Sequence, residues 1–257
     1  DCDLLLDQNY FQDGDSRYEG LVMPACTKLL GPKYALLRPE FAEVRKHLKP
    51  RTGKVQRVFV FFGGVDSHNV TSMALRALSM PDFDELKVDV VIGENNQHRS
   101  QITDLVAKRP RTKLHVQIDN IAELMAQADL ALGAGGATTW ERLCLGLPSI
   151  VITVADNQKD FISSLHQDGF LFWLGSIESV DKDKLKTQLL RTLSDITENQ
   201  SQFLRCVTAV KGNGSCLIVD IMRKGILSDS WTIRSAAISD CEIFWHWAND
   251  ADVRDSV

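Results

Sequence analysis

Short apolar runs alternate with amphipathic stretches through the middle of this sequence, and this alternation restricts the fold more than any other feature. The first run, residues 57–62, reads RVFVFF, as a strand buried on both faces requires. In the stretch that follows, apolar residues from Val70 to Leu78 are spaced three or one positions apart, which buries one face of a helix. Parallel strands need crossover helices, and right-handed crossovers cover both faces of a sheet. The pattern therefore predicts an α/β fold with a doubly wound parallel sheet.

Six strands with connecting helices are expected here. The strands are placed at residues 57–62, 87–92, 113–118, 150–154 and 170–173, with one more that begins at Leu130. Helices are expected around 70–78, 102–106, 121–128 and 161–167, and another after the glycine turn that follows Leu130. Two outer helices are predicted at about 182–193 and 215–224.

The first fifty residues do not show this alternation and are predicted as an irregular N-terminal segment. A short strand is expected at 3–7 and a brief helix at 41–47. Residues 31–39 are predicted as extended chain, because residues that precede proline avoid the helical region.

The sequence suggests three parts. Residues 1–50 are interpreted as the end of a preceding domain with its crossover, 51–228 as the main domain, and 229–257 as the start of a further domain. The chain begins with Asp1 rather than Met, which favours a fragment of a longer protein.

Composition excludes several classes of function. The net charge is −5 and no dense Lys/Arg run is present, which disfavours nucleic acid as a partner. No apolar run reaches the ~18 residues of a membrane span, so we expect a soluble, cytoplasmic protein. The six cysteines are scattered, with no C-x-x-C pair and no histidine at metal spacing, so reduced thiols and no metal site are expected.

A glycine turn after the strand at Leu130 carries the strongest functional signal. Gly135, Gly136, Ala137 and Thr138 lie between that strand and a helix. Glycines let a ligand approach the backbone closely, and the free amides of a helix's first turn attract anions. Glu141 falls about one turn into the helix, where its carboxylate can accept hydrogen bonds from both hydroxyls of a ribose. The stretch predicts a nucleotide site.

A second glycine turn, containing Gly63, Gly64 and Asp66, follows the first strand of the sheet. Alone it is equally well explained as an ordinary turn that needs a positive φ. Ligands of doubly wound sheets bind beyond the carboxyl ends of the strands, where both turns are expected. Together they favour phosphate binding. His68 lies beside this turn, and whether it pairs with phosphate, acts as a base or does neither is left open.

Polar side chains also follow the strand at 150–154. Asp156 is interpreted as a plain helix N-cap. Asn157 and Gln158 are expected to project over the same sheet edge, where their amides can donate to sugar hydroxyls.

These motifs resemble a known family. Residues 133–141 with Gly146-Leu-Pro148, preceded by residues 61–66, are similar to the C-terminal domain of GT-B proteins of the MurG type, which is Rossmann-like. Residues 2–6, 18–22 and 34–41 resemble more closely the UDP-sugar hydrolases of pseudaminic acid synthesis. The resemblance covers roughly residues 1–225.

The resemblance implies a set of roles. The loop of Gly63, Gly64 and Asp66 and residues 135–138 would hold the diphosphate, Glu141 the ribose, and the backbone near Ile121 the uracil. Asn157 and Gln158 would hold the sugar of a UDP-sugar, and no cofactor is implied.

The hydrolase family releases UDP from UDP-2,4-diacetamido-2,4,6-trideoxy-β-L-altropyranose with water and inverts the anomeric centre. Its general base is a histidine in a glycine-rich loop of the N-terminal domain, a loop that this sequence does not contain, so no catalytic residue is assigned and the fragment alone is expected to be inactive. The rival hypotheses are a MurG-like glycosyltransferase and a non-catalytic UDP-sugar-binding module.

The tail from Trp231 to Arg254 is similar to the first strand and helix of GNAT-type N-acetyltransferases. Acetyl-CoA would then be a partner only through a remainder of that domain which the sequence lacks.

Overall fold

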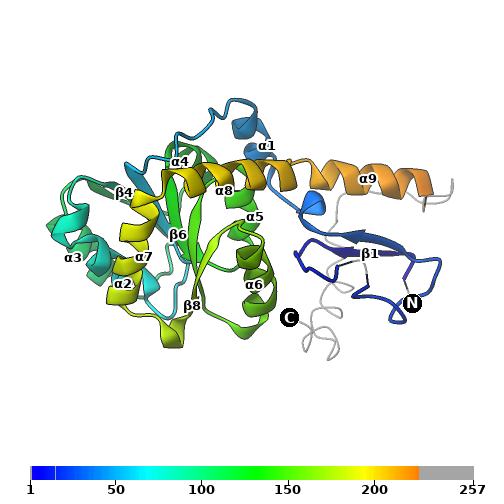
Figure 1. Cartoon of the computed structure of the whole chain (residues 1–257), viewed down its shortest axis with the longest axis horizontal. Helices are drawn as coiled ribbons and strands as arrows, with labels where there is room; N and C mark the ends of the chain where they lie inside the picture. The colour runs from blue at the N-terminus through cyan, green and yellow to red at the C-terminus, as the bar shows by residue number, and fades with distance from the viewer. Residues whose placement is uncertain (1, 15, 226–257) are drawn as a thin grey trace. The chain divides into compact units, whose positions relative to one another are not determined.

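A computed structural model describes residues 2–14 and 16–225 of the chain. Its centre is a sheet of six parallel strands (Figure 1). The strands are β3 (Arg57–Phe61), β4 (Lys87–Ile92), β5 (Thr112–Val116), β6 (Leu130–Ala134), β7 (Ser149–Thr153) and β8 (Phe172–Ser176). The predicted doubly wound parallel sheet is therefore confirmed, and each expected strand is present within a few residues of its place.

The strand order is β5-β4-β3-β6-β7-β8. The chain builds outward from β3 to β5 and then returns to place β6 beside β3, where Phe61 is opposite Gly133. This reversal is a topological switch point, and the two strands that flank it diverge into loops at their carboxyl ends.

Helices cover both faces of the sheet. Helices α2 (Val70–Leu78), α3 (Arg99–Lys108) and α7 (Lys182–Ser194) pack on one face against Val58, Val60 and Val90. The other face, which carries Phe59 and Val91, packs against α1 (Pro39–Lys46), α4 (Ile121–Gln127), α5 (Thr138–Cys144), α6 (Lys159–Gln167) and α8 (Ile196–Ala209). Successive strand residues point to opposite faces, so each apolar run supplies both cores.

The N-terminal segment has more order than the sequence indicated. β1 (Leu4–Asp7) pairs in parallel with β2 (Thr27–Leu30), a strand that was not predicted. The extended chain expected at 31–39 is wrong for Pro32–Tyr34, which forms a 3-10 helix with proline at its start. Arg38, directly before Pro39, is extended as expected, and α1 confirms the brief helix.

Toward the C-terminus the sequence analysis missed α8 and predicted α7 and α9 (Gly214–Gly225) within one residue at each end. Close contacts group the described residues up to Val219 into one compact unit, and a second unit begins at Asp220. The proposed boundaries at 50 and 228 stay predictions. The GNAT-like tail lies outside the described residues.

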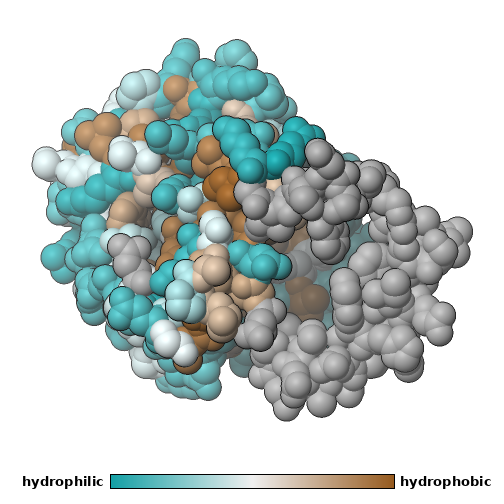
Figure 2. All heavy atoms as spheres, turned by 90° about the vertical axis from the view of Figure 1, so that its right-hand side faces the viewer, coloured by the Kyte–Doolittle hydropathy of each residue, from teal (hydrophilic) through white to brown (hydrophobic). Residues whose placement is uncertain are grey.

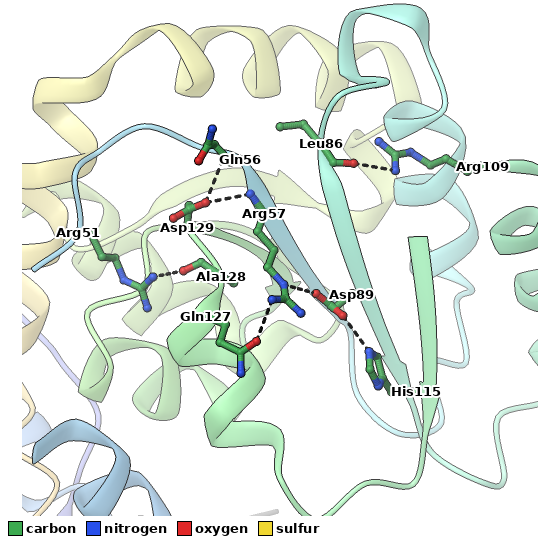
Figure 3. A network of polar contacts seen from close by, with 10 residues as sticks. All are labelled: Arg51, Gln56, Arg57, Leu86, Asp89, Arg109, His115, Gln127, Ala128 and Asp129. Carbon is green, nitrogen blue, oxygen red and sulfur yellow. Dashed lines mark hydrogen bonds and ion pairs between the residues drawn. The ribbon is translucent and has the colours of Figure 1, made fainter. Parts of the chain in front are cut away.

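The amino ends of the strands are tied together by polar contacts, shown in Figure 3. Asp129 accepts hydrogen bonds from the backbone amides of Gln56, at 2.9 Å, and Arg57, at 2.8 Å. The Arg51 guanidinium donates to the carbonyl groups of Met125 and Ala128 at the end of α4. Burial lowers the pKa of Arg51 to about 10, so the group stays charged at neutral pH. These contacts anchor the linker that leads into β3.

Hydrophobic and hydrophilic residues are mixed on the face drawn in Figure 2. Large hydrophobic side chains that are exposed within the described part come from segments far apart in the sequence: Leu21, Met23, Leu36, Val65, Leu190, Ile196 and Leu204. Exposed apolar residues that are scattered in this way are normal for a globular surface. None of the helices described combines the length and the apolar character needed to cross a membrane.

Candidate functional site

The two glycine turns meet at the switch point of the sheet. The turn with Gly63 and Gly64 leaves the carboxyl end of β3, and the turn with Gly135 and Gly136 leaves that of β6, its direct neighbour. Gly63 has a φ of 101°, a conformation that disfavours other residues. The two turns therefore lie at one edge of the sheet.

A pocket of about 260 Å³ opens at this edge. Four residues singled out from the sequence line it: Gly64, Ile121, Thr138 and Glu141. They come from the β3 turn, the first residue of α4, and the first turn of α5. Residues distant in the sequence thus surround one hollow, as the nucleotide-site hypothesis requires.

Glu141 is the acidic group of this pocket. Its side chain is 15% exposed, and its Oε1 lies 3.5 Å from Nη2 of Arg38. Burial raises the pKa of the Glu141 carboxyl, while the positive charges of Arg38 and Arg142 oppose that rise. Arg38 also reaches Oε1 of Glu40, at 3.2 Å, so the arginine is shared between two carboxylates.

Arg142 lies beneath the β6 turn and is fully buried. Its guanidinium donates to the carbonyl of Ala134 at 2.8 Å and to the hydroxyls of Thr138 and Thr139, both at 3.1 Å. Burial lowers its pKa to about 10. The group therefore remains cationic at neutral pH and stiffens the turn from within. Because Thr138 accepts this bond through its oxygen, its own hydroxyl proton is available to a ligand.

Asp66 does not face the pocket. Its carboxylate is buried and accepts hydrogen bonds from the amides of Val70, at 3.0 Å, and Thr71, at 2.9 Å. Both donors belong to the first turn of α2, so Asp66 satisfies amides that would otherwise be free. The side chain predicted to help hold a diphosphate acts as a cap of this helix.

Gly135, Gly136, Ala137 and Gln158 lie beside the pocket rather than in its wall. Gln158 Oε1 accepts a hydrogen bond from the Val154 amide at 3.0 Å. The same side chain packs on Gly135, where a Cβ would meet its Oε1 at 3.1 Å. Close packing therefore explains Gly135, while a Cβ on Gly136 would meet Nε2 of Gln158 at an ordinary contact distance of 4.0 Å.

Asn157 and His68 are exposed and line none of the pocket. The expected N-cap role of Asp156 is wrong: residues Asp156–Gln158 form a 3-10 turn, and α6 begins only at Lys159. Asp156 pairs with the side chain of Lys159 at 2.5 Å instead.

Residues 57–213 match the glycosyltransferase family 28 C-terminal domain. The chain belongs to this family. The match begins at the first residue of β3 and ends after α8, so it includes the whole six-stranded sheet and both glycine turns.

Three relatives of the family 28 domain illustrate its range. The UDP-2,4-diacetamido-2,4,6-trideoxy-β-L-altropyranose hydrolase of Campylobacter jejuni is 25% identical over 66% of this chain and 59% of that protein. The spore coat polysaccharide biosynthesis protein SpsG of Bacillus subtilis is 28% identical over 64% of the chain and 48% of its own length. A UDP-N-acetylglucosamine--N-acetylmuramyl-(pentapeptide) pyrophosphoryl-undecaprenol N-acetylglucosamine transferase of Rickettsia conorii is 28% identical over 61% and 44%. The chain thus spans about half the length of these relatives.

Among solved structures, MurG of Acinetobacter baumannii superposes with a TM-score of 0.54 and 18% identity, over 68% of this chain and 54% of that one. This likeness establishes the fold, a GT-B Rossmann-like domain.

Two residues with polar side chains that line this pocket were not found from the sequence. Arg38 reaches it from the segment before α1, and Gln117 comes from the loop after β5, where it has a φ of 47°. A signal for Arg38 existed, because it stands in the stretch that resembles the hydrolases. The sequence contains no such signal for Gln117, because no motif or periodicity in its own segment distinguishes this residue.

Proposed function

We propose that this chain is the nucleotide-binding half of a UDP-sugar hydrolase that releases UDP from UDP-2,4-diacetamido-2,4,6-trideoxy-β-L-altropyranose in the cytoplasm. The observation that carries the proposal is the place of Glu141, in a pocket between the two strand ends of the switch point. This is where doubly wound sheets bind nucleotides. A half-buried carboxylate there suits the two hydroxyls of a ribose.

In this proposal each part of the pocket binds a different part of the nucleotide. Glu141 accepts the ribose hydroxyls, the backbone at Ile121 meets the uracil, and Gly64 and Thr138 face the diphosphate. Donors aimed at the diphosphate stabilise the charge that develops on UDP as it leaves. No residue of this chain is assigned to activate water, so its share of the reaction is binding, orientation and stabilisation of the leaving group.

The size of the pocket is consistent with a binding site that this chain forms together with another part of a longer protein. Its 260 Å³ is a little below the ~300–1,000 Å³ of small-molecule sites. A nucleoside fits such a space more readily than a complete UDP-sugar. We therefore expect the sugar to be held jointly with chain that the longer relatives possess, with Gln158 and Asn157 at its margin.

Isothermal titration with UDP tests the binding part. Losing charge-assisted hydrogen bonds to a ribose costs about 1.5–3 kcal/mol, so Glu141→Ala should weaken UDP binding about 10- to 100-fold. Glu85→Ala is the matched control, because this glutamate is 86% exposed and lies before the amino end of β4, away from the pocket. Failure of the unaltered chain to bind UDP would overturn the proposal.

A MurG-like glycosyltransferase is the second candidate, favoured by the 28% identity with the Rickettsia transferase. A hydrolase and a glycosyltransferase need the same nucleotide pocket, so a binding measurement does not distinguish the two functions. Product analysis does, on a protein that carries this chain at the full length of its relatives. Release of free sugar and UDP without an acceptor supports hydrolysis, and turnover only with an acceptor supports transfer. If the UDP-sugar is bound but stays intact under both conditions, the chain belongs to a non-catalytic binding module.

A further inference from the structure

Two cysteines far apart in the sequence touch at the beginning of the β1–β2 pair. Sγ of Cys2 lies 3.4 Å from Sγ of Cys26. Cys2 precedes β1 and Cys26 directly precedes β2, and the Thr27 amide donates to the Asp3 carbonyl at 2.9 Å between them. Parallel pairing of the strands therefore holds the two thiols together.

The surroundings of the two sulfur atoms differ. Cys2 is exposed, whereas Cys26 is 7% exposed. A hollow of about 360 Å³ adjoins both and is lined by Cys2, Asp3, Met23, Ala25 and Cys26. Of these two thiols, Cys2 is therefore the more accessible to a small reagent.

We propose that Cys2 and Cys26 form a reversible disulfide, with a low-molecular-weight disulfide of the glutathione class as the oxidant. Disulfide sulfur atoms lie about 2.05 Å apart, so the thiols need only a small approach from their present contact. Residues 3–25 would then form a closed loop that ties β1 to β2. This site is separate from the nucleotide pocket and does not depend on its assignment.

The disulfide forms in two successive thiol–disulfide exchange steps. The Cys2 thiolate attacks one sulfur of the oxidant, which forms a mixed disulfide and expels one thiolate. Cys26 then loses its proton and attacks Cys2 Sγ, which expels the second thiolate. Two protein thiols are oxidised by two electrons, and one small disulfide is reduced to two thiols. Burial and the neighbouring Cys2 thiol raise the pKa of Cys26, so its thiolate is scarcer and it is the poorer nucleophile for the first step.

Intact mass and peptide mapping after incubation of the folded chain with oxidised glutathione test the proposal. We expect the mass to fall by two hydrogens, with a cross-linked peptide pair that contains Cys2 and Cys26. Cys26→Ser should instead keep glutathione on Cys2, because the second step is removed. Cys216→Ser is the matched control, since this exposed cysteine lies on α9, and it should leave the cross-link intact.

Thermal unfolding supplies an independent measurement. Closing a loop of this length should raise the melting temperature of the oxidised chain by about 5 °C or more over the reduced chain, and Cys2→Ser should abolish the difference. Stable glutathione on Cys2 of the unaltered chain, or a cross-link to any other cysteine, would overturn the assignment.

Discussion

The guanidinium of Arg142 packs directly against Gly133, the next-to-last residue of strand β6. A Cβ added to Gly133 would collide with Nη1 of Arg142. The same Cβ would lie 3.0 Å from the carbonyl oxygen of Phe61. The glycine is thus required by a buried cation rather than by a ligand. Gly133 and Gly135 are therefore both explained by close packing at the end of β6.

Gly133→Ala should destabilise the chain by about 1–3 kcal/mol, as overpacking in a core does. Arg142 cannot move aside without losing its bonds to Ala134 and two threonines. Urea unfolding measures the change. Gly136→Ala is the control, with an expected change within about 0.5 kcal/mol, because the added Cβ would meet Nε2 of Gln158 at an ordinary contact distance of 4.0 Å. Equal losses for both variants would contradict this role of Arg142.

Arg38→Ala should weaken binding of UDP about tenfold and leave uridine binding unchanged or tighter. We expect Arg38 to turn from Glu141 to a phosphate when UDP enters, and loss of a charge-assisted hydrogen bond has about this effect. Titrations with UDP and uridine measure both. Arg111→Ala is a matched control, because Arg111 is 51% exposed against 52% for Arg38 and lies away from the pocket. A parallel loss for both ligands would show that Arg38 acts on the nucleoside or on the fold.

Binding of a UDP-sugar should weaken on acidification at a pH above the range of an ordinary glutamate. Burial raises the pKa of Glu141, so its carboxylate is protonated, and lost as an acceptor, earlier than in water. The doubly esterified diphosphate of the ligand does not titrate there. Affinity measured against pH for the chain and Glu141→Gln tests this, and the variant should show no such dependence.

The same raised pKa has a consequence for stability. Protonated Glu141 favours the folded state, so its contribution is present at acid pH and lost as the pH rises through the folded-state pKa. Glu141→Gln should therefore be at least as stable as the unaltered chain at neutral pH. Denaturant unfolding of both proteins measures this. A large destabilisation by the variant would mean that the pair with Arg38 supports the fold.

Asp89→Asn should destabilise the chain by about 3 kcal/mol at neutral pH, because it breaks a buried ion pair. Asp89 is 4% exposed in its side chain and accepts from Arg57 at 2.6 Å and His115 at 2.8 Å (Figure 3). Burial raises its pKa, but these two partners outweigh burial and hold the pKa below the usual range.

The sign of the pH effect follows from that lowered pKa. The stabilisation by Asp89 is present above about pH 4 and is lost as the pH falls through the folded-state pKa. Stability curves of the chain and Asp89→Asn should therefore converge in acid. Asp156→Asn, which removes an exposed pair with Lys159, should leave stability almost unchanged at any pH, because solvent screens that pair.

Local patterns in the sequence determined the layered α/β fold, the places of the six strands in its central sheet and both glycine turns. Each of these depends on periodicity or on glycine chemistry within a few neighbouring residues, which is why RVFVFF predicted β3 so closely. Helix α8 was missed because its start, Ile196, follows α7 after one residue, and no break in composition marks the junction.

Only the tertiary structure decided which of the candidate residues share a pocket. Strand order placed β6 beside β3, and that single pairing brought Glu141 to Gly64 and Ile121 while it left Asn157 and His68 outside. The fold also brought Arg38 to Glu141, more than one hundred residues further along the chain. These contacts join residues far apart in the chain, and their partners depend on how the strands cross over, which no local pattern encodes.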